Sequence, residues 1–443
     1  MAPYRTQPTP PSQDAILEKL ITGANEMAPR GGLRGTKLRA EMPLLLNPTK
    51  APVPCMEPAE EFDAVNAIFS DQVRAFFNAM HAFEEMADKK SPDEPDLIHE
   101  ESGMGLAISV CDQSYDIYPD CWHRACFTRR LTVLNPSNLP LLNRVTRLRI
   151  YPEKYYNYDL DMQFIQMRPI SPHMPFDLIA RLPHLRELNC PWLWERLPIA
   201  YTSRALRILC RPWEGPWRDA RVEFGRAMRQ IMPSLLSSLT KARFWFWRLN
   251  YCGGDTDQAV QMPDLVRASS TTLSDFEGMD PVSLRLRDLG TRLEELSIRA
   301  LLTPDLFRSS SWPRMRRLDV EFHLCAPDGR WYFSSPRGED PHPAGFAITE
   351  EEHYPSGLED FEETHELLDR ETEDCSRPHE MTEQRRPDMF RIRPIPERIE
   401  PLLLEFALSL RRQNMPSLEA AEISTWFEWL PSDERVQEYE GSN

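Results

Sequence analysis

The stretch Leu293-Glu-Glu-Leu296-Ser-Ile298 has apolar residues at its first, fourth and sixth positions, and this spacing indicates the fold class. Its last part alternates apolar and polar residues, which is typical of a strand that buries one face. Three further stretches repeat the pattern closely: residues 145–150, 185–190 and 315–320. Looser copies occur at 206–211, 239–244, 273–278 and 418–423.

Many of these copies follow one another at 20 to 40 residues. Leucine-rich repeats place a short strand about every 20–29 residues, and longer intervals leave room for a helix and its loops. The sequence therefore predicts an α/β fold, an irregular leucine-rich-repeat-like solenoid with its strands in one largely parallel sheet. The alternative is a generic α+β domain.

The rest of the chain divides by composition. Prolines and glycines crowd the start, whereas apolar residues recur at helical spacing from Phe62 to Ala87. Inside the proline-rich start, Ile16 to Ile21 predict one short helix with Ser12 as a possible cap. We expect five parts: 1–58, proline-rich and mostly disordered; 59–135, helical, with a long amphipathic helix at 60–90; 136–325, the repeat array; 326–395, a hairpin and an acidic disordered insertion; and 396–443, a terminal helix and the last repeat. The long helix is expected to pack on the protein body, the alternative being a face for a partner helix.

Charge is unevenly distributed along the chain. The net charge is −17, which disfavours nucleic acid and anionic membranes at long range. Residues 141–250 carry 18 basic and 9 acidic side chains, whereas residues 336–388 carry 17 acidic and 5 basic ones. Asp328-Gly329 predicts a hairpin turn before this acidic segment. We expect the acidic segment to be mobile, to lie part of the time on the Arg-rich face of the array, and to compete there with acidic ligands.

Cysteine usage and hydropathy point to an intracellular protein of the cytoplasm or nucleus. The nine cysteines are an odd number and are widely scattered, which favours reduced thiols. The first residues lack the apolar run of a signal peptide. The longest aliphatic stretch, residues 402–410, contains Glu405 and is too short to span a bilayer. We therefore expect no membrane partner.

Several segments together resemble a known protein family. They are Pro191-Trp-Leu-Trp-Glu-Arg-Leu-Pro198, residues 293–304, Ala326-Pro-Asp-Gly-Arg-Trp-Tyr-Phe333 and His353-Tyr-Pro. Across roughly residues 130–430 the chain resembles the repeat half of filamentous-fungal F-box and leucine-rich-repeat proteins. The resemblance implies a non-enzymatic scaffold for protein–protein interaction, like the substrate-recognition half of a cullin-RING ubiquitin ligase receptor. It implies a Skp-type adaptor as partner only if an F-box is present, and residues 1–130 show no recognisable F-box opening.

Motifs that could carry chemistry are weak. His365-Glu366-Leu-Leu-Asp369 lacks the second histidine of a zinc-protease helix. Cys121, His123 and Cys126 lack paired Cys-x-x-Cys spacing, so we expect buried thiols and not zinc. Gly103-Met-Gly105 lacks the third glycine of a dinucleotide-binding loop. The sequence predicts no catalytic residue, cofactor or metal, and an enzyme whose site is assembled from distant residues stays open as an alternative.

Phe244-Trp245-Phe246-Trp247 is a run of aromatic residues flanked by basic ones. A strand would place two of the four rings on each face, so two belong to the core. Stacking on single-stranded nucleic acid through the basic 141–250 region is a further alternative, but tryptophan and arginine most often anchor protein interfaces. We expect the partner to be a protein of unknown identity that binds a concave sheet face. The predicted binding residues are Arg147, Arg149, Glu187, Asn189, Arg243, Trp245, Trp247, Glu295, Ser297, Arg299, Arg317, Asp319 and Glu321.

Overall fold

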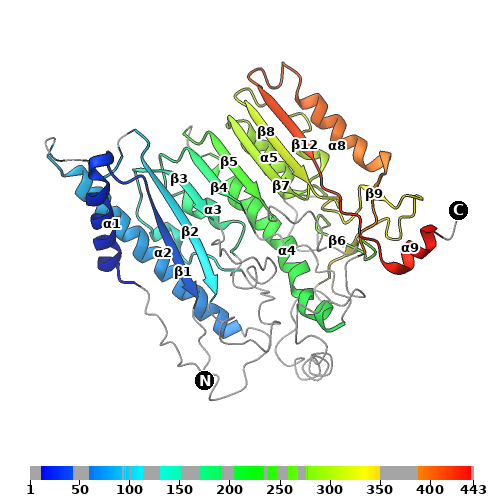
Figure 1. Ribbon diagram of the computed structural model, residues 1–443, viewed down its shortest axis with the longest axis horizontal. Coiled ribbons are helices and arrows are strands. Elements are labelled where there is room, and N and C mark those ends of the chain that lie inside the picture. Colours follow the sequence, from blue (N-terminus) through cyan, green and yellow to red (C-terminus); the bar gives the residue numbers. More distant parts are fainter. Residues whose placement is uncertain are drawn as a thin grey trace, which may run out of the picture. The chain divides into compact units, whose positions relative to one another are not determined.

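The computed structural model shows an α/β protein (Figure 1). It describes residues 11–42, 59–91, 94, 96–99, 101–112, 130–150, 170–191, 193, 204–233, 238–246, 258–267, 276, 278–349 and 388–440. Eight strands form a sheet in the order β1-β2-β3-β4-β5-β7-β8-β12. The strand pairs whose register is known in this sheet are all parallel.

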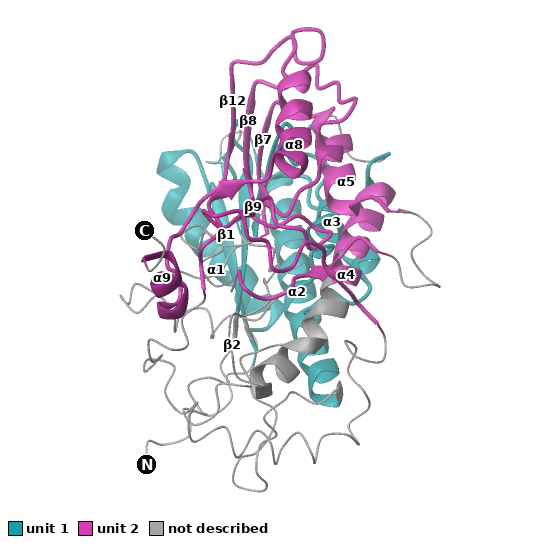
Figure 2. Ribbon diagram, turned by 90° about the vertical axis from the view of Figure 1, so that its right-hand side faces the viewer, with its two compact units in different colours: residues 1–192, 231–242 teal, residues 193–230, 243–443 magenta. Residues whose placement is uncertain are grey.

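The chain divides into two compact units (Figure 2). The first comprises residues 1–192 and 231–242, and the second residues 193–230 and 243–443. Strand β5 (Lys241–Trp245) begins in the first unit and ends in the second. The expected five-part division drew its boundaries from composition, whereas the two units follow the packing of the chain.

The first unit contains two long helices and four strands. Its elements are α1 (Gln13–Met27), a 3-10 turn (Ala28–Arg30), β1 (Gly35–Met42), α2 (Ala59–Asp88), β2 (Met104–Asp112), a second 3-10 turn (Pro136–Asn138), β3 (Val145–Ile150), α3 (Met174–Ile179) and β4 (Glu187–Cys190). The Ser12 hydroxyl accepts a hydrogen bond from the Ala15 N–H at 3.3 Å, so the predicted cap of the first helix is confirmed. The predicted helix at 60–90 is also confirmed, and its Phe69, Phe76 and Phe83 are buried.

Strands β1 and β2 differ from the sequence-based expectation. Residues 35–42 lie in the part expected to be mostly disordered, and residues 104–112 in the part expected to be helical. In β1, Leu38, Ala40 and Met42 are buried, and helix α2 packs against this strand. This apolar surface stabilises a strand even in a segment rich in glycine and proline.

The second unit contains the remaining elements. They are α4 (Arg204–Ile231, whose last residue lies in the first unit), β5, β6 (Pro263–Asp264), α5 (Pro281–Gly290), β7 (Glu295–Ala300), a 3-10 turn (Pro304–Leu306), β8 (Arg317–Phe322), β9 (Phe333–Ser334), β10 (Phe346–Ala347), β11 (Arg393–Pro394), α8 (Pro396–Ser409), β12 (Ala420–Ser424) and α9 (Asp433–Glu440). In Figure 2 the helices α4, α5 and α8 lie on one side of strands β7, β8 and β12.

The predicted strand register is confirmed. Leu148 pairs with Leu188 and Leu296 with Leu318, and all four side chains are buried. Their strands belong to one sheet, as expected. Because side chains alternate along a strand, the residues between these leucines lie on the opposite face of the sheet.

Two of the looser copies gave a different outcome. Residues 206–211 lie within helix α4 and not on a strand, so this assignment was wrong. A short apolar run fits a helix as well as a strand, and here the helix forms. The copy at 273–278 lies largely outside the described residues.

The predicted hairpin is confirmed by an antiparallel bridge between Cys325 and Trp331, with Gly329 at a φ of 76° in the turn. The acidic segment that follows is described as far as residue 349, and within this part Ile348 is buried and Asp340 forms ion pairs. The expected disorder therefore does not extend to residues 336–349. Residues 350–387, on which the expected mobile excursion depends, lie outside the described part.

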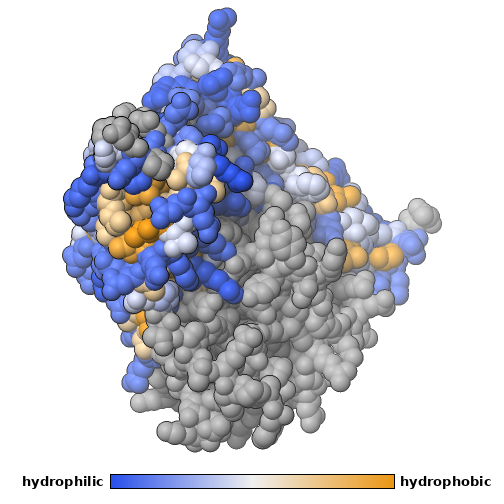
Figure 3. Space-filling view, turned by 60° about the vertical axis from the view of Figure 1, so that its left-hand side comes forward, coloured by the Kyte–Doolittle hydropathy of each residue, from blue (hydrophilic) through white to orange (hydrophobic). Residues whose placement is uncertain are grey.

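Among the coloured residues of the face drawn in Figure 3, hydrophilic ones predominate, and a compact apolar patch lies at the left. Among the described helices, none is long and apolar enough to cross a membrane.

Candidate functional site

In the first unit, the face of the sheet opposite the buried leucines is basic. The parallel register aligns Lys37, Ala107 and Arg149 in one row across β1, β2 and β3. In the row before it, Arg147 lies beside Gly105. Lys37, Arg147 and Arg149 are exposed, and Arg39 lies exposed on the same face of β1. The central strand β2 thus presents small side chains between two strands with basic ones. We call Lys37, Arg39, Arg147 and Arg149 the basic face.

The Arg147 guanidinium lies over β2. Its Nη2 donates to the backbone carbonyl of Arg34 at 3.0 Å. A β carbon added at Gly105 would lie 3.6 Å from Nε and Nη2 of Arg147, which is ordinary contact distance. A larger side chain at position 105 would occupy the place of the guanidinium. Gly105 therefore leaves room for a positive charge close to the backbone of the sheet.

Polar atoms without partners lie on this same face. Ser109 is the next residue after Ala107 on this face of β2. It is fully buried, yet its hydroxyl has no hydrogen-bond partner in the described structure. Asn189 pairs in register with Arg149, and its Oδ1 is also buried without a partner among the described residues. A buried polar atom without a partner costs free energy. A ligand or water with donor groups would remove this cost.

In the second unit, the sheet face opposite the buried leucines carries two pairs of opposite charges in register, Glu295 with Arg317 and Arg299 with Glu321. Between them, the uncharged Ser297 pairs with Asp319. The nearly buried Arg299 donates from Nη2 to Glu321 Oε2 at 2.6 Å. This face is therefore mixed in charge.

Trp245 is held between two arginines on this face. The guanidinium carbons of Arg243 and Arg299 lie 4.7 and 4.6 Å from its ring centroid. Its indole N–H donates to Ser297 Oγ at 3.0 Å, and this hydroxyl donates to Asp319 Oδ2 at 2.9 Å. Cation–π contacts and hydrogen bonds thus fix an aromatic ring that is half-exposed.

The structure brings the predicted binding residues together in two groups. In the first unit Arg147, Arg149, Glu187 and Asn189 share one face, and in the second unit Arg243, Trp245, Glu295, Ser297, Arg299, Arg317, Asp319 and Glu321 share one face. Trp247 lies outside the described residues. Sequence reasoning missed Lys37, Arg39 and Ser109, because it assigned no strand at 35–42 or 104–112. The alternation of apolar residues from Leu38 to Met42 and from Leu106 to Val110 was the signal that could have found them.

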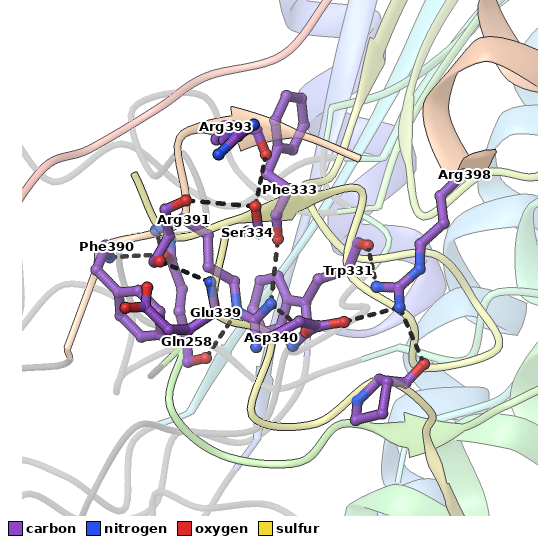
Figure 4. Close-up of polar contacts among 12 residues, drawn as sticks. Gln258, Trp331, Phe333, Ser334, Glu339, Asp340, Phe390, Arg391, Arg393 and Arg398 are labelled. Atoms are coloured by element: carbon purple, nitrogen blue, oxygen red, sulfur yellow. Dashed lines mark hydrogen bonds and ion pairs between the residues drawn. The ribbon is translucent and has the colours of Figure 1, made fainter. Parts of the chain in front are cut away.

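A second polar cluster lies at Arg391, a fully buried residue (Figure 4). Its Nη1 donates to Asp340 Oδ1 at 2.6 Å and to the Phe333 carbonyl at 3.1 Å. Its Nε donates to the Gln258 carbonyl at 2.9 Å, and the guanidinium carbon lies 5.0 Å from the Trp331 ring centroid. The charge is therefore both paired and hydrogen-bonded, as a buried charge requires.

Asp340 is shared by two arginines. Its Oδ2 forms an ion pair with Arg398 of helix α8 at 2.7 Å, and Arg398 also donates to the Trp331 carbonyl at 2.8 Å. Burial raises the pKa of Asp340, but the hydrogen bonds and charges of Arg391 and Arg398 outweigh this effect and hold the pKa below its usual value. This cluster anchors the start of α8 to the loop after β9 and has a structural role.

His323 and Cys325 lie side by side in the same region. The Cys325 N–H donates to His323 Nδ1 at 3.0 Å, and the thiol donates to the Ala326 carbonyl at 3.3 Å. Burial lowers the pKa of His323 to about 4 and raises the pKa of Cys325 well above its usual value. A neutral imidazole beside a protonated thiol is not the arrangement of an activated nucleophile.

The other chemical motifs add no site to the described structure. His365, Cys121, His123 and Cys126 lie outside the described residues. Within the described ranges, no group of three or more His, Cys, Asp or Glu residues is placed to hold a metal ion.

Comparisons with protein-family models, with curated proteins and with solved structures found no match to this chain.

Proposed function

We propose that the chain is an irregular leucine-rich-repeat-like scaffold that recognises an acidic segment of another protein. The observation that carries this proposal is the basic face, Lys37, Arg39, Arg147 and Arg149, arranged around the small residues of β2. Arginine and lysine that project from parallel strands match carboxylates spaced along a partner chain.

The parallel sheet supports the proposal of a scaffold. Short parallel strands bury leucines on one face, and helices α4, α5 and α8 lie on one side of strands β7, β8 and β12. In repeat proteins of this kind, the face without helices is the binding surface. Trp245, which is fixed between Arg243 and Arg299, would serve as a rigid aromatic anchor for the same partner class.

We do not extend the proposal to a Skp-type adaptor. An F-box is a separate set of short helices, whereas α1 and α2 pack on each other and α2 packs on β1 within the first unit. Co-purification of a Skp-type adaptor and a cullin with the full chain would reopen the ligase interpretation.

The test compares charge-reversal variants in quantitative affinity capture from a native extract. The test variant is Arg147→Glu with Arg149→Glu, on the basic face. The control is Lys89→Glu with Lys90→Glu, which makes the same charge change just after α2. Proteins that the wild type and the control retain, and the test variant loses, would support the proposal. Equal loss from both variants would show that only the net charge matters and would contradict it. Retention of RNA in place of protein would favour the nucleic-acid alternative.

A further inference from the structure

Strand β12 is at one end of the sheet, and among the described residues its outer edge has no partner strand. It pairs with β8 alone, and no other strand of the described chain pairs with it. Figure 2 views the molecule from this side and shows β12 with α8 and α5 to one side of it. The Ala420 N–H donates to the Arg316 carbonyl at 3.0 Å, toward β8. Because successive N–H groups of a strand point to opposite edges, those of Ala421 and Ile423 point outward.

Strand β12 lacks three of the common protections of an edge strand, namely lysine, proline and a bulge. Natural edge strands carry lysine, proline or a bulge that prevents further pairing. The residues of β12, Ala420-Ala-Glu-Ile-Ser424, include no lysine or proline, and the register with β8 is unbroken. Ala421 and Ile423 pair with Leu318 and Val320, which are buried, but are themselves only half-buried. The apolar core is therefore only partly covered at β12.

Exposed apolar residues occur in the segment after β12 and in helix α8. Trp426, the second residue after β12, is 57% exposed, and Phe427 and Trp429 are exposed as well. Phe427 packs edge-on against Phe333 and Trp429 stacks on Tyr439, so both rings are fixed in place. Leu404 of α8 is exposed too. Helix α8 and the stretch from β12 onward therefore expose apolar side chains beside polar ones, among them Glu400 and Glu422.

The acidic character of residues 396–443 favours a basic partner strand over a second copy of the chain. Residues 396–443 carry ten acidic and four basic side chains. On the sheet face opposite the core, Glu422 pairs in register with Asp319, and both are exposed. A second copy that paired antiparallel about the centre of β12 would place Glu422 against its own counterpart, which is unfavourable. An added strand with basic residues on this face would neutralise both carboxylates.

We propose that the outer edge of β12 is a docking site for an extended peptide that alternates basic and apolar residues. The peptide backbone pairs with the outward N–H and C=O groups of Ala421 and Ile423. Its apolar side chains extend the core beside Ile423, and its basic side chains approach Glu422 and Asp319. This mode is strand addition, in which the main chain supplies affinity and alternate side chains supply specificity. The site is separate from the basic face and does not depend on it.

The probe is a fluorescein-labelled synthetic peptide of alternating arginine and valine, measured by fluorescence anisotropy with the full chain. A peptide with the same composition, arranged as a block of valines and a block of arginines, is the control ligand. Ala421→Pro removes an outward N–H and leaves the ladder to β8 intact, because proline is tolerated at an outward edge position. We expect it to weaken binding at least about tenfold, which corresponds to about 1.4 kcal/mol.

Charge is tested with a matched pair of variants. Glu422→Lys acts at the edge, and Glu400→Lys makes the same change on an exposed position of α8. The proposal expects only the first to weaken binding. Three results would overturn the proposal. The first is that Glu422→Lys and Glu400→Lys weaken binding equally. The second is that the block peptide binds as tightly as the alternating one, and the third is that Ala421→Pro binds the alternating peptide as tightly as the wild type does. A dimer in sedimentation experiments that Ala421→Pro dissociates would show that a second copy occupies the edge and would overturn the proposal too.

If Ala421→Pro fails to fold, hydrogen exchange in the wild-type protein provides the test. In the wild-type protein, the peptide should slow exchange of the segment that contains Ala421 and Ile423. Unchanged exchange there at saturating peptide would contradict the proposal.

Discussion

The fully buried Arg391 and the half-buried Asp340 form an ion pair, with Nη1 and Oδ1 2.6 Å apart, although 51 positions separate them in the chain. The pair joins the loop after β9 to the segment that leads into α8. Its arginine has no exposed surface, so the carboxylate is essential to its burial.

Replacement of Asp340 by alanine should therefore be strongly destabilising. Loss of one partner of a buried pair leaves an uncompensated charge, and the expected cost is about 3–5 kcal/mol in the free energy of unfolding. Urea denaturation monitored by circular dichroism measures it. Glu419→Gln is the control, because the pair of Glu419 with Arg316 is exposed and should contribute little. Similar midpoints for the two variants would show that Asp340 is not needed to hold Arg391.

His323 should make stability depend on pH. Its folded pKa of about 4 lies below the ordinary value of 6.5, so the unfolded chain binds a proton more readily between these values. The contribution of His323 is complete above about pH 6.5 and is lost as the pH falls toward 4, by about 2 kcal/mol at pH 5. Denaturation of the wild type and of His323→Asn at pH 7 and pH 5 measures it. An equal loss in both proteins would exclude His323 as the cause.

Leu296→Ala should cost about 2–5 kcal/mol, because it creates a cavity in the core behind β7 and β8. Leu296 is buried and pairs in register with Leu318. Arg317→Ala, on the opposite face of β8, should change stability by less than about 0.5 kcal/mol. Differential scanning calorimetry compares the two variants. A melting temperature unchanged by Leu296→Ala would mean that the residue does not support the core.

The strands of the sheet were predictable where leucines mark alternate positions. Leu148, Leu188, Leu296 and Leu318 each give a local pattern that reports burial directly, and the structure places all four in the core. Strand β1 was missed because its pattern is short and weak: Ala40 buries little apolar surface, and glycines precede the strand. Its stability comes from pairing with β2 and packing on α2, neither of which is visible locally.

The candidate sites were predictable only in part. The face of Arg147 and Arg149 follows from their alternation with Leu148, whereas the addition of Lys37 depends on pairing across 70 positions of sequence. Likewise, Trp245 could be placed on a strand face, but its position between Arg243 and Arg299 required the neighbouring strand. No sequence pattern signals the pairing of Arg391 with Asp340.

The most direct test of the proposed function is the affinity of the purified full chain for an acidic peptide. A fluorescein-labelled peptide rich in aspartate and glutamate is titrated with the wild type, with Arg147→Glu plus Arg149→Glu, and with Lys89→Glu plus Lys90→Glu, at low and high salt. We predict that the wild type and the Lys89/Lys90 variant bind equally, that the Arg147/Arg149 variant binds at least about tenfold more weakly, and that salt weakens binding. Binding that is the same in all three proteins, or lost equally in both variants, would contradict recognition by the basic face.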